Sequence, residues 1–480
     1  MAKIRTRFAP SPTGYLHIGG LRTALYGYLY AKKQGGDFIL RIEDTDTARY
    51  VDGSVQIIYD TLRDSGIMYD EGPDIGGNYG PYVQSERKAI YKEYAEKLVK
   101  LGGAYYCFCT PERISSLKDA EGNVRYDKHC LKLSEEEIAQ KIKNGEPYVI
   151  RQNIPEHGVG SYHDLVYGDI SVDYKDIEDG ILLKSDGMPT YNFANVIDDH
   201  LMGITHVIRG TEYLSSTPKY NLMYDAFGWE RPVYIHLPPI MKDAQHKLSK
   251  RNGDASYEDF VKKGFVKEAI VNYIALLGWS PKSNVEKMSL AELIENFSLD
   301  GISKSPSIFD EVKMRWLSGE YIKAMTDEEL ASRANDFFKK SKVYGKYDIK
   351  KIAALLKTRI ETFDEIPDKI NFLEEFGEYD VALYTHKKMK TDVEVAKLVL
   401  PKAREVIAAL PEFTFDAIHD ALMDLVQKMQ MKTGQIFWCV RVAISGKEST
   451  PGGVMEIADL LGREETLRRL DFSIGLLNKQ

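Results

Sequence analysis

The first fifty residues combine two short apolar runs with one helical pattern. Residues 3–9 (KIRTRFA) alternate polar and apolar side chains, which predicts a β-strand. After a loop rich in proline and glycine, apolar side chains between Leu21 and Leu29 recur at helical spacing. Residues 38–42 (FILRI) form a second apolar run. Strand, helix and strand in this order predict a βαβ unit, and therefore a parallel sheet.

The pattern changes twice further along the chain. Residues 107–187 carry many turn signals and short strand-like runs at Tyr148–Arg151 and Ile181–Lys184, which favours an α+β insertion. Strand and helix alternate again at Tyr191–Gly210. After about Glu320 glycines become rare and amphipathic helical periods dominate. We predict an α/β domain with an α+β insertion, followed by an all-α C-terminal half.

Composition narrows the class of protein. The chain has 480 residues, 43% of them hydrophobic and 28% charged, which excludes wholesale disorder and favours about three globular domains. Four cysteines are too few for a disulfide scaffold. The most apolar run, residues 269–279, is too short to span a bilayer, and the N-terminus lacks an apolar signal core. We therefore expect a cytoplasmic protein without a membrane partner.

Three clusters could carry chemistry. The loop before the first helix holds small residues and His17, which suits phosphate, although a tight loop with a packed histidine explains it equally well. The basic run Lys247–Arg251 (KLSKR) could compensate a polyphosphate or form a solvated turn. Arg7, Glu43 and Arg209 stand in or beside apolar strands, so they need a ligand or one another.

A fourth cluster consists of thiols. Cys107 and Cys109, followed by Cys130, could contribute to a tetrahedral zinc site. The CxC spacing is less specific than a CxxC pair, and three free thiols remain the alternative.

Several of these segments together resemble one family. Arg7–Gly14 (RFAPSPTG) with His17–Gly20 (HIGG) resembles the first signature of class I aminoacyl-tRNA synthetases in their glutamyl/glutaminyl form. Lys247–Arg251 resembles the second signature, and Arg41–Asp46 (RIEDTD) and Val207–Gly210 (VIRG) match as well. The helical C-terminal half resembles the anticodon-binding region of bacterial glutamyl enzymes, whereas glutaminyl enzymes carry β-barrels there.

The resemblance implies a domain plan. It places a class I Rossmann-like parallel-sheet catalytic domain at residues 1–84 and 196–242. An inserted acceptor-stem-binding α+β domain would occupy residues 85–195. A stem-contact helical domain with the KLSKR loop would occupy residues 243–325. An all-helical anticodon-binding region would occupy residues 326–480, in two subdomains that meet near residue 380.

The activity implied is that of a glutamate–tRNA ligase, acting as a monomer. Such an enzyme activates L-glutamate with ATP and Mg²⁺, releases pyrophosphate, and transfers glutamate to the 3′-terminal adenosine of glutamate tRNA. An alternative enzyme would also charge glutamine tRNA with glutamate. Two further rivals are a tRNA-modifying relative, which lacks the helical C-terminal half, and a non-catalytic tRNA-binding homologue.

The resemblance also assigns site residues. The catalytic residues would be His17, Lys247 and Lys250. The glutamate-binding residues would be Arg7, Ala9, Ser11, Glu43, Thr45, Tyr191, Asn195 and Arg209. The ATP-binding residues would be His17, Gly19, Gly20, Glu212, Ile240, Lys247, Ser249 and Lys250. The anticodon-reading residues would be Arg359, Thr450 and Pro451. The candidate zinc ligands would be Cys107, Cys109 and Cys130, with Tyr126 or His129 as the fourth because Lys132 replaces the histidine of some relatives.

Overall fold

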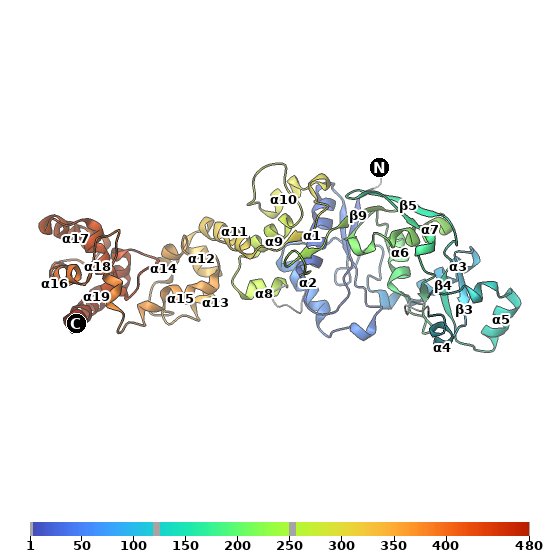
Figure 1. Ribbon diagram of the computed structural model, residues 1–480, viewed down its shortest axis with the longest axis horizontal. Coiled ribbons are helices and arrows are strands. Elements are labelled where there is room, and N and C mark those ends of the chain that lie inside the picture. The colour runs from blue at the N-terminus through green and yellow to red at the C-terminus, as the bar shows by residue number, and fades with distance from the viewer. Residues whose placement is uncertain (1–2, 119–124, 249–255, 480) are drawn as a thin grey trace. The chain divides into compact units, whose positions relative to one another are not determined.

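The computed structural model describes residues 3–118, 125–248 and 256–479, which form two compact units coloured along the sequence in Figure 1. The first unit comprises Met1–Phe260 and Ile270–Asp310, and the second comprises Val261–Ala269 and Glu311–Gln480. Among the described residues no helix is long and apolar enough to cross a membrane.

The first unit begins with the βαβ unit predicted from the sequence. β1 (Arg5–Phe8) and β2 (Asp37–Leu40) pair in parallel, and α1 (Ile18–Lys33) connects them. The leucines of α1 are fully or almost fully buried, because its apolar stripe packs against the strands. Both the helix and the parallel pairing are confirmed.

A second set of strands extends this arrangement. Its sheet has the order β6-β5-β9-β8, and β8 and β9 run parallel. The bounds are β5 (Val159–Asp164), β6 (Gly168–Asp173), β8 (His206–Gly210) and β9 (Val233–Leu237). β1 lies beside the start of β8, because the Thr205 N–H donates to the Arg5 carbonyl at 3.0 Å. The carboxyl ends of these parallel strands meet at one edge, where α/β folds bind ligands.

The inserted segment forms an α+β layer, as predicted. Its antiparallel sheet has the order β3-β4-β7. The bounds are α3 (Lys88–Lys100), β3 (Ala104–Cys107), α4 (Pro111–Ser115), α5 (Glu135–Lys143), β4 (Val149–Gln152) and β7 (Ile181–Leu183). Its core joins Tyr91 and Leu98 of α3 to Ile150 and Leu183 of the sheet and to Phe193.

The remaining elements of the first unit surround the sheet. Their bounds are α2 (Ser54–Asp64), α6 (Tyr191–Leu201), α7 (Thr217–Phe227), β10 (Ile240–Met241), α8 (Tyr257–Lys262), α9 (Lys267–Leu276), α10 (Leu290–Asn296) and β11 (Ser307–Ile308). α8 and α9 each continue across a boundary between the two units.

The second unit is built from helices, and its described residues between 311 and 479 contain no strand. The bounds are α11 (Glu311–Ala324), α12 (Asp327–Arg333), α13 (Asn335–Phe338), α14 (Ile349–Leu356), α15 (Ile366–Ile370), α16 (Val393–Ala408), α17 (Phe415–Met429), α18 (Thr433–Ser445) and α19 (Val454–Asn478). Buried Arg469 of α19 donates to the carbonyls of Ile444 and Phe372 at 2.8 and 3.1 Å. The all-α prediction is confirmed.

Candidate active site

The loop after β1 ends in a histidine that caps α1. His17 is the N-cap residue, and its Nδ1 accepts a hydrogen bond from the Gly19 N–H at 3.0 Å. A neutral imidazole that accepts at Nδ1 carries its proton on Nε2, so Nε2 is a donor. A Cβ on Gly19 would stand 3.1 Å from that Nδ1, which is why a side chain there would press on the ring. A donor at a helix N-terminus suits a phosphate oxygen.

Described residues at both ends of the second signature form backbone pairs. The backbone of His17 pairs with Ser256 in an isolated antiparallel bridge. On the other side of the KLSKR run, Lys247 bridges to Met241 of β10, and the Leu248 N–H donates to the Ile240 carbonyl at 3.1 Å. The Lys247 side chain is exposed. Two predicted residues of this run, Ser249 and Lys250, lie outside the described residues.

A buried ionic cluster occupies the carboxyl end of β1. Arg7 donates from Nε and Nη2 to the two carboxylate oxygens of Asp199 at 3.0 and 3.2 Å, and from Nη1 to the Ile208 carbonyl at 3.2 Å. Asp199 also accepts from Nη1 of Arg41 at 2.8 Å. Arg41 in turn donates from Nη2 to Glu43 at 2.9 Å. Asp199 thus bridges two arginines, and Arg41 joins Glu43 to them.

The two carboxylates of this cluster are perturbed in opposite directions. Burial alone would raise the pKa of Asp199, but the charges and hydrogen bonds of Arg7 and Arg41 hold it below its usual range. Burial raises the pKa of Glu43 above its usual range, although Arg41 and Arg7 oppose this. Asp199 is therefore a fixed anion, whereas Glu43 is a carboxylate for which a cation would be a favourable partner.

The neighbouring carboxylate on α6 faces the inserted segment. Asp198 accepts hydrogen bonds from Nε of Arg87 at 2.7 Å, from Tyr91 at 2.8 Å and from Gln84 at 2.9 Å. Burial and the nearby Asp198 charge raise the pKa of Tyr91. The buried charges of this region cancel, because three arginines face three carboxylates: Arg7, Arg41, Arg87, Glu43, Asp198 and Asp199.

Arg209 at the end of β8 differs from these three arginines. Its side chain is 5% exposed, and it donates from Nε to Nε2 of His236 at 3.2 Å and from Nη2 to Oγ1 of Thr217 at 2.7 Å. Within the described part of the chain no carboxylate pairs with it. The rings of Tyr213 and Tyr220 lie 4.9 and 4.8 Å from its guanidinium carbon. A buried cation without an anionic partner is costly, so this position favours the binding of an anion.

The other predicted pocket residues lie at different depths. Thr45 and Asn195 are buried, whereas Ser11 and Glu212 are exposed. Ala9, Gly19 and Gly20 are partly buried at the loop, and Ile240 is buried on β10. Burial, followed by the charge of Glu43, raises the pKa of Tyr191, and Arg209 opposes this. The Tyr191 phenol therefore lies within electrostatic reach of Glu43 and Arg209. Arg7 donates to the carbonyl of Ile208, which precedes Arg209, so these four side chains lie in the same part of the first unit.

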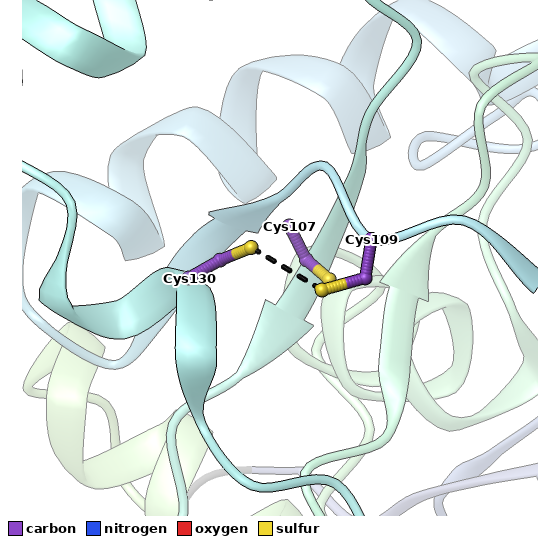
Figure 2. A group of neighbouring side chains, drawn as sticks. All are labelled: Cys107, Cys109 and Cys130. Carbon is purple, nitrogen blue, oxygen red and sulfur yellow. Dashed lines mark hydrogen bonds between the residues drawn. The ribbon is translucent and has the colours of Figure 1, made fainter. Parts of the chain in front are cut away.

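The cysteine side chains of residues 107, 109 and 130 lie around one tyrosine. The sulfur atoms of Cys107, Cys109 and Cys130 all lie within 4.8 Å of one another, and Figure 2 shows them pointing to a common centre. The Tyr126 hydroxyl is 3.3 Å from the Cys107 sulfur and 3.4 Å from the Cys109 sulfur. The His129 side chain is exposed and is not part of this group. Of the two candidates for a fourth ligand, the structure brings only Tyr126 to the thiols.

The environment shifts the pKa values of two of these thiols in opposite directions. Burial alone would raise the pKa of Cys107, but hydrogen bonds from Tyr126 and Arg151 bring it below its usual value. Burial raises the pKa of Cys109 to about 11. The Arg151 Nε lies 3.3 Å from the Cys107 sulfur, and its guanidinium also covers the Tyr126 ring at 4.4 Å.

The second unit contains a separate cavity of about 530 Å³. Arg359, Thr450 and Pro451 all line it, together with the exposed Trp316. The Arg359 side chain is exposed and makes no hydrogen bond or ion pair within the described part of the chain. Thr450 donates to the Gly452 carbonyl at 2.6 Å, which fixes the turn that carries Pro451. The three residues predicted to read the anticodon therefore line the same cavity, whose volume is in the range of ligand-binding sites.

Sequence reasoning missed several residues that organise the pocket. Asp199 and His236 received no role, although Asp199 closely follows the apolar pair Val196–Ile197 in NVIDDH and His236 lies within the apolar run VYIHL. Asp164 and Thr217 carry no comparable local signal, because their importance depends on contacts with β9 and β8.

Comparisons with known proteins agree along the whole chain. The profile of the tRNA synthetases class I (E and Q), catalytic domain, matches residues 3–316, and that of the anticodon binding domain matches residues 329–474. A glutamate–tRNA ligase of Clostridium kluyveri is 57% identical over 481 residues, and one of Clostridium novyi is 55% identical over 482 residues. Each alignment covers 99% of both chains. The crystal structure of a glutamate tRNA ligase from Elizabethkingia meningosepticum, in complex with its amino acid, superposes with a TM-score of 0.90. It is 35% identical, and the match covers 99% of this chain and 100% of that one.

Proposed function

The chain belongs to the class I tRNA synthetases of the E and Q type, and we propose that it is a glutamate–tRNA ligase. It activates L-glutamate with ATP to glutamyl-adenylate, releases pyrophosphate, and transfers glutamate to the 3′-terminal adenosine of glutamate tRNA. The observation that carries this proposal is Arg209, a buried guanidinium that no carboxylate of the described residues neutralises. It lies beside a cluster whose own charges cancel, so the pocket as a whole requires an anion.

Two arginines hold the two carboxylates of glutamate. Arg209 meets the α-carboxylate, because a guanidinium has five N–H groups and its protein partners use two of them. Arg7 meets the side-chain carboxylate. It uses three of its five N–H groups for Asp199 and the Ile208 carbonyl and keeps two for a second carboxylate. Glutamate thereby brings one net negative charge to a pocket with one excess positive charge.

The remaining pocket residues bind the rest of the amino acid. Glu43 accepts the α-ammonium group, which adds a cation beside Arg41 and offsets the burial that raises the pKa of this carboxyl. Tyr191 forms the wall between Glu43 and Arg209. Further contacts come from residues of the first loop, the segment after β2 and α6: Ala9, Ser11, Thr45 and Asn195.

This arrangement discriminates against glutamine by polar matching. The glutamine amide would turn an N–H₂ group toward the N–H groups of Arg7 and leave a buried charge underpaired. The cost of such a mismatch is roughly 2–3 kcal/mol, or about 30–150-fold in binding. Asp199 supports the discrimination because it prevents Arg7 from rotating away from the pocket.

The first reaction needs no side-chain nucleophile. An oxygen of the glutamate α-carboxylate attacks the α-phosphorus of ATP, the bond to the bridging oxygen breaks, and pyrophosphate leaves. ATP binds as its Mg²⁺ complex. His17 donates from Nε2 to the phosphates, and Gly19 and Gly20 allow them to approach the helix N-terminus. Lys247 and Lys250 neutralise charge on the leaving group, as positioned cations do in phosphoryl transfer. Glu212, Ile240 and Ser249 contact the nucleotide.

The second reaction uses the tRNA that the rest of the chain binds. The terminal ribose hydroxyl attacks the carbonyl carbon of the adenylate, and AMP leaves. Residues 85–195 contact the acceptor stem of the tRNA, and residues 243–325 form a helical domain that also contacts a stem of the tRNA. In residues 326–480, whose two parts meet near residue 380, Arg359 reads the third anticodon base. Thr450 and Pro451 contact the first two anticodon bases at the same cavity.

A zinc ion fits the cysteine cluster. Zinc prefers four soft or nitrogen and oxygen donors in a tetrahedron, with about 2.3 Å to each thiolate. Cys107, Cys109 and Cys130 with the Tyr126 oxygen supply four such donors, and the sulfur atoms of Cys109 and Cys130 are 3.5 Å apart. Zinc here would be structural: it would fix β3 to the turn at Cys130 and takes no part in the reaction.

The proposal is tested by charging purified tRNAs with radiolabelled glutamate, with ATP–pyrophosphate exchange measured in the presence and absence of tRNA. We expect charging of glutamate tRNA alone, by a monomeric cytoplasmic enzyme. Charging of glutamine tRNA as well would refute the specificity and keep the chemistry. Charging of neither, by folded protein that binds ATP, would refute the proposed function in favour of a tRNA-modifying or regulatory role.

A further inference from the structure

A chain of three buried side chains leads from β5 through β9 to β8. Asp164 at the end of β5 lies 2.7 Å from Nδ1 of His236 on β9, and both side chains are 0% exposed. The Nε2 of the same imidazole accepts from Nε of Arg209 at 3.2 Å. These contacts join three adjacent strands of one sheet at its carboxyl edge.

The protons of this chain can be placed. Oδ1 of Asp164 accepts the backbone N–H groups of Val166 and Tyr167 at 2.9 and 2.8 Å, and Oδ2 accepts the backbone N–H of His236 at 3.1 Å. Burial alone would raise the pKa of Asp164, but His236 and these backbone donors hold it below its usual range. Asp164 is therefore ionised and can only accept, so Nδ1 of His236 is the donor.

The second nitrogen of the imidazole is consequently an acceptor. Burial lowers the pKa of His236, so the ring is neutral and its single N–H points to Asp164. The lone pair on Nε2 faces Arg209. Thr217 completes the arrangement, because its hydroxyl donates to the Tyr213 carbonyl at 2.8 Å and thus accepts from Nη2 of Arg209 at 2.7 Å.

We propose that Asp164 and His236 are positioning residues for Arg209: Asp164 fixes the His236 tautomer, and His236 then holds the Arg209 guanidinium edge-on so that its remaining N–H groups face the substrate α-carboxylate. The proposal rests on the proposed function of Arg209. Because the chain forms β5 between β4 and β7 of the α+β layer, it also makes the amino-acid pocket depend on how that part of the chain folds.

Asp164→Asn tests this with a minimal change of shape. Oδ1 accepts two backbone N–H groups, so the amide oxygen will take that place and the N–H₂ group will face His236. The imidazole must then accept at Nδ1 and carry its proton on Nε2. The Nε2–H of His236 and the Nε–H of Arg209 are both donors, so the hydrogen bond between these side chains is lost. A purely structural role for Asp164 predicts lower stability without a selective effect on one substrate.

The measurement is ATP–pyrophosphate exchange in the presence of tRNA, with KM determined separately for glutamate and for ATP. We expect Asp164→Asn to raise the KM for glutamate at least tenfold and to change the KM for ATP less than twofold. The double variant Asp164→Asn/His236→Gln offers Arg209 an amide oxygen in place of Nε2, so it should recover a third or more of the lost affinity for glutamate.

Two further variants separate the possible failures. Tyr26→Phe removes buried hydrogen bonds to the carbonyls of Ala275 and Leu277 elsewhere in the same unit, so it controls for lost stability, which is followed by thermal melting. Equal increases in both KM values for Asp164→Asn, or a glutamate KM within twofold of Tyr26→Phe, would overturn the proposal. If wild type shows no glutamate-dependent exchange, or Arg209→Ala leaves the glutamate KM unchanged, the proposed function itself fails.

Discussion

Replacing Arg7 by alanine removes one of the two guanidinium groups assigned to glutamate. In the folded protein Arg7 holds both oxygens of Asp199 and the Ile208 carbonyl, which leaves two of its five N–H groups for the side-chain carboxylate of the substrate. Arg7→Ala therefore has two separable consequences. It weakens the binding of glutamate, and it deprives a buried carboxylate of one of its two partners.

The magnitudes follow from these contacts. A charged hydrogen bond contributes about 1.5–3 kcal/mol, so loss of a contact with two such bonds costs roughly 3–6 kcal/mol, or about 10²–10⁴-fold in kcat/KM for glutamate. Removing one partner of a buried ion pair typically costs about 3–5 kcal/mol of folding free energy. Because Asp199 keeps Arg41 at 2.8 Å, we expect the lower end of that range.

Arg5 provides the matched control for this experiment. It lies on the same strand and pairs with Asp37 and Glu71 at 2.9 and 3.1 Å, but it is not assigned to the pocket. Urea unfolding should show a comparable loss of stability for Arg5→Ala and Arg7→Ala. Pyrophosphate exchange should show a raised KM for glutamate in Arg7→Ala alone, with the KM for ATP within threefold of wild type. Equal effects of Arg7→Ala on both substrates, or equal effects of the two variants on glutamate, would refute the reasoning.

Three further changes test other parts of the molecule. Arg359→Ala should lower kcat/KM for glutamate tRNA by roughly 10–100-fold, because a lost base contact costs about 1–3 kcal/mol. Arg404→Ala is the control and should keep the charging rate within twofold of wild type. Equal losses in the two variants would contradict a role of Arg359 in reading a base. Wild type should bind about one zinc ion per chain, measured by atomic absorption. Cys130→Ser should abolish this binding, and Cys439→Ser should not. Wild-type protein without zinc would contradict the metal assignment. Hydrogen bonds from two arginines lower the pKa of Glu465 from 4.5 to about 2, so its stabilisation is present above pH 4.5 and is lost as the pH falls toward 2. Glu465→Gln should therefore lower the free energy of unfolding by roughly 1–2 kcal/mol at pH 7, a value that allows for solvent screening. At pH 2.5 the loss should be much smaller. An equal loss at both pH values would contradict the proposed effect of the two arginines on Glu465.

The sequence predicted those elements that one short window specifies. The apolar spacing from Leu21 to Leu29 is a local property of α1, and the flanking apolar runs are sufficient for the parallel pair. The all-helical second unit could be predicted for the same reason. Arg7 and Arg209 stood out because an arginine within an apolar strand is costly without a partner.

What the sequence could not supply was the pairing of these charges. Residue-level reasoning left mutual salt bridges and ligand binding as equal alternatives for Arg7, Glu43 and Arg209, and the structure shows salt bridges for the first two. Arg7 and Glu43 are joined through Asp199 and Arg41, whereas Arg209 has no carboxylate partner among the described residues. Such pairings depend on contacts between residues nearly 200 positions apart, which no local pattern records. The same applies to Tyr126, whose place among the thiols depends on the path of the chain between β3 and Cys130.

The adjacent carboxylates of α6 also limit how this chain can be divided or recombined. Asp199 faces the strands of the pocket and Asp198 faces Arg87 and Tyr91, so one helical turn carries anchors for two layers. A shortened chain that joined residue 84 directly to residue 196 would keep Asp198 but lose both of those partners, and a buried anion would remain. The inserted segment is therefore not a detachable module. Exchange of this segment between relatives should give a folded protein only when Arg87, Tyr91 and Asp198 are transferred together.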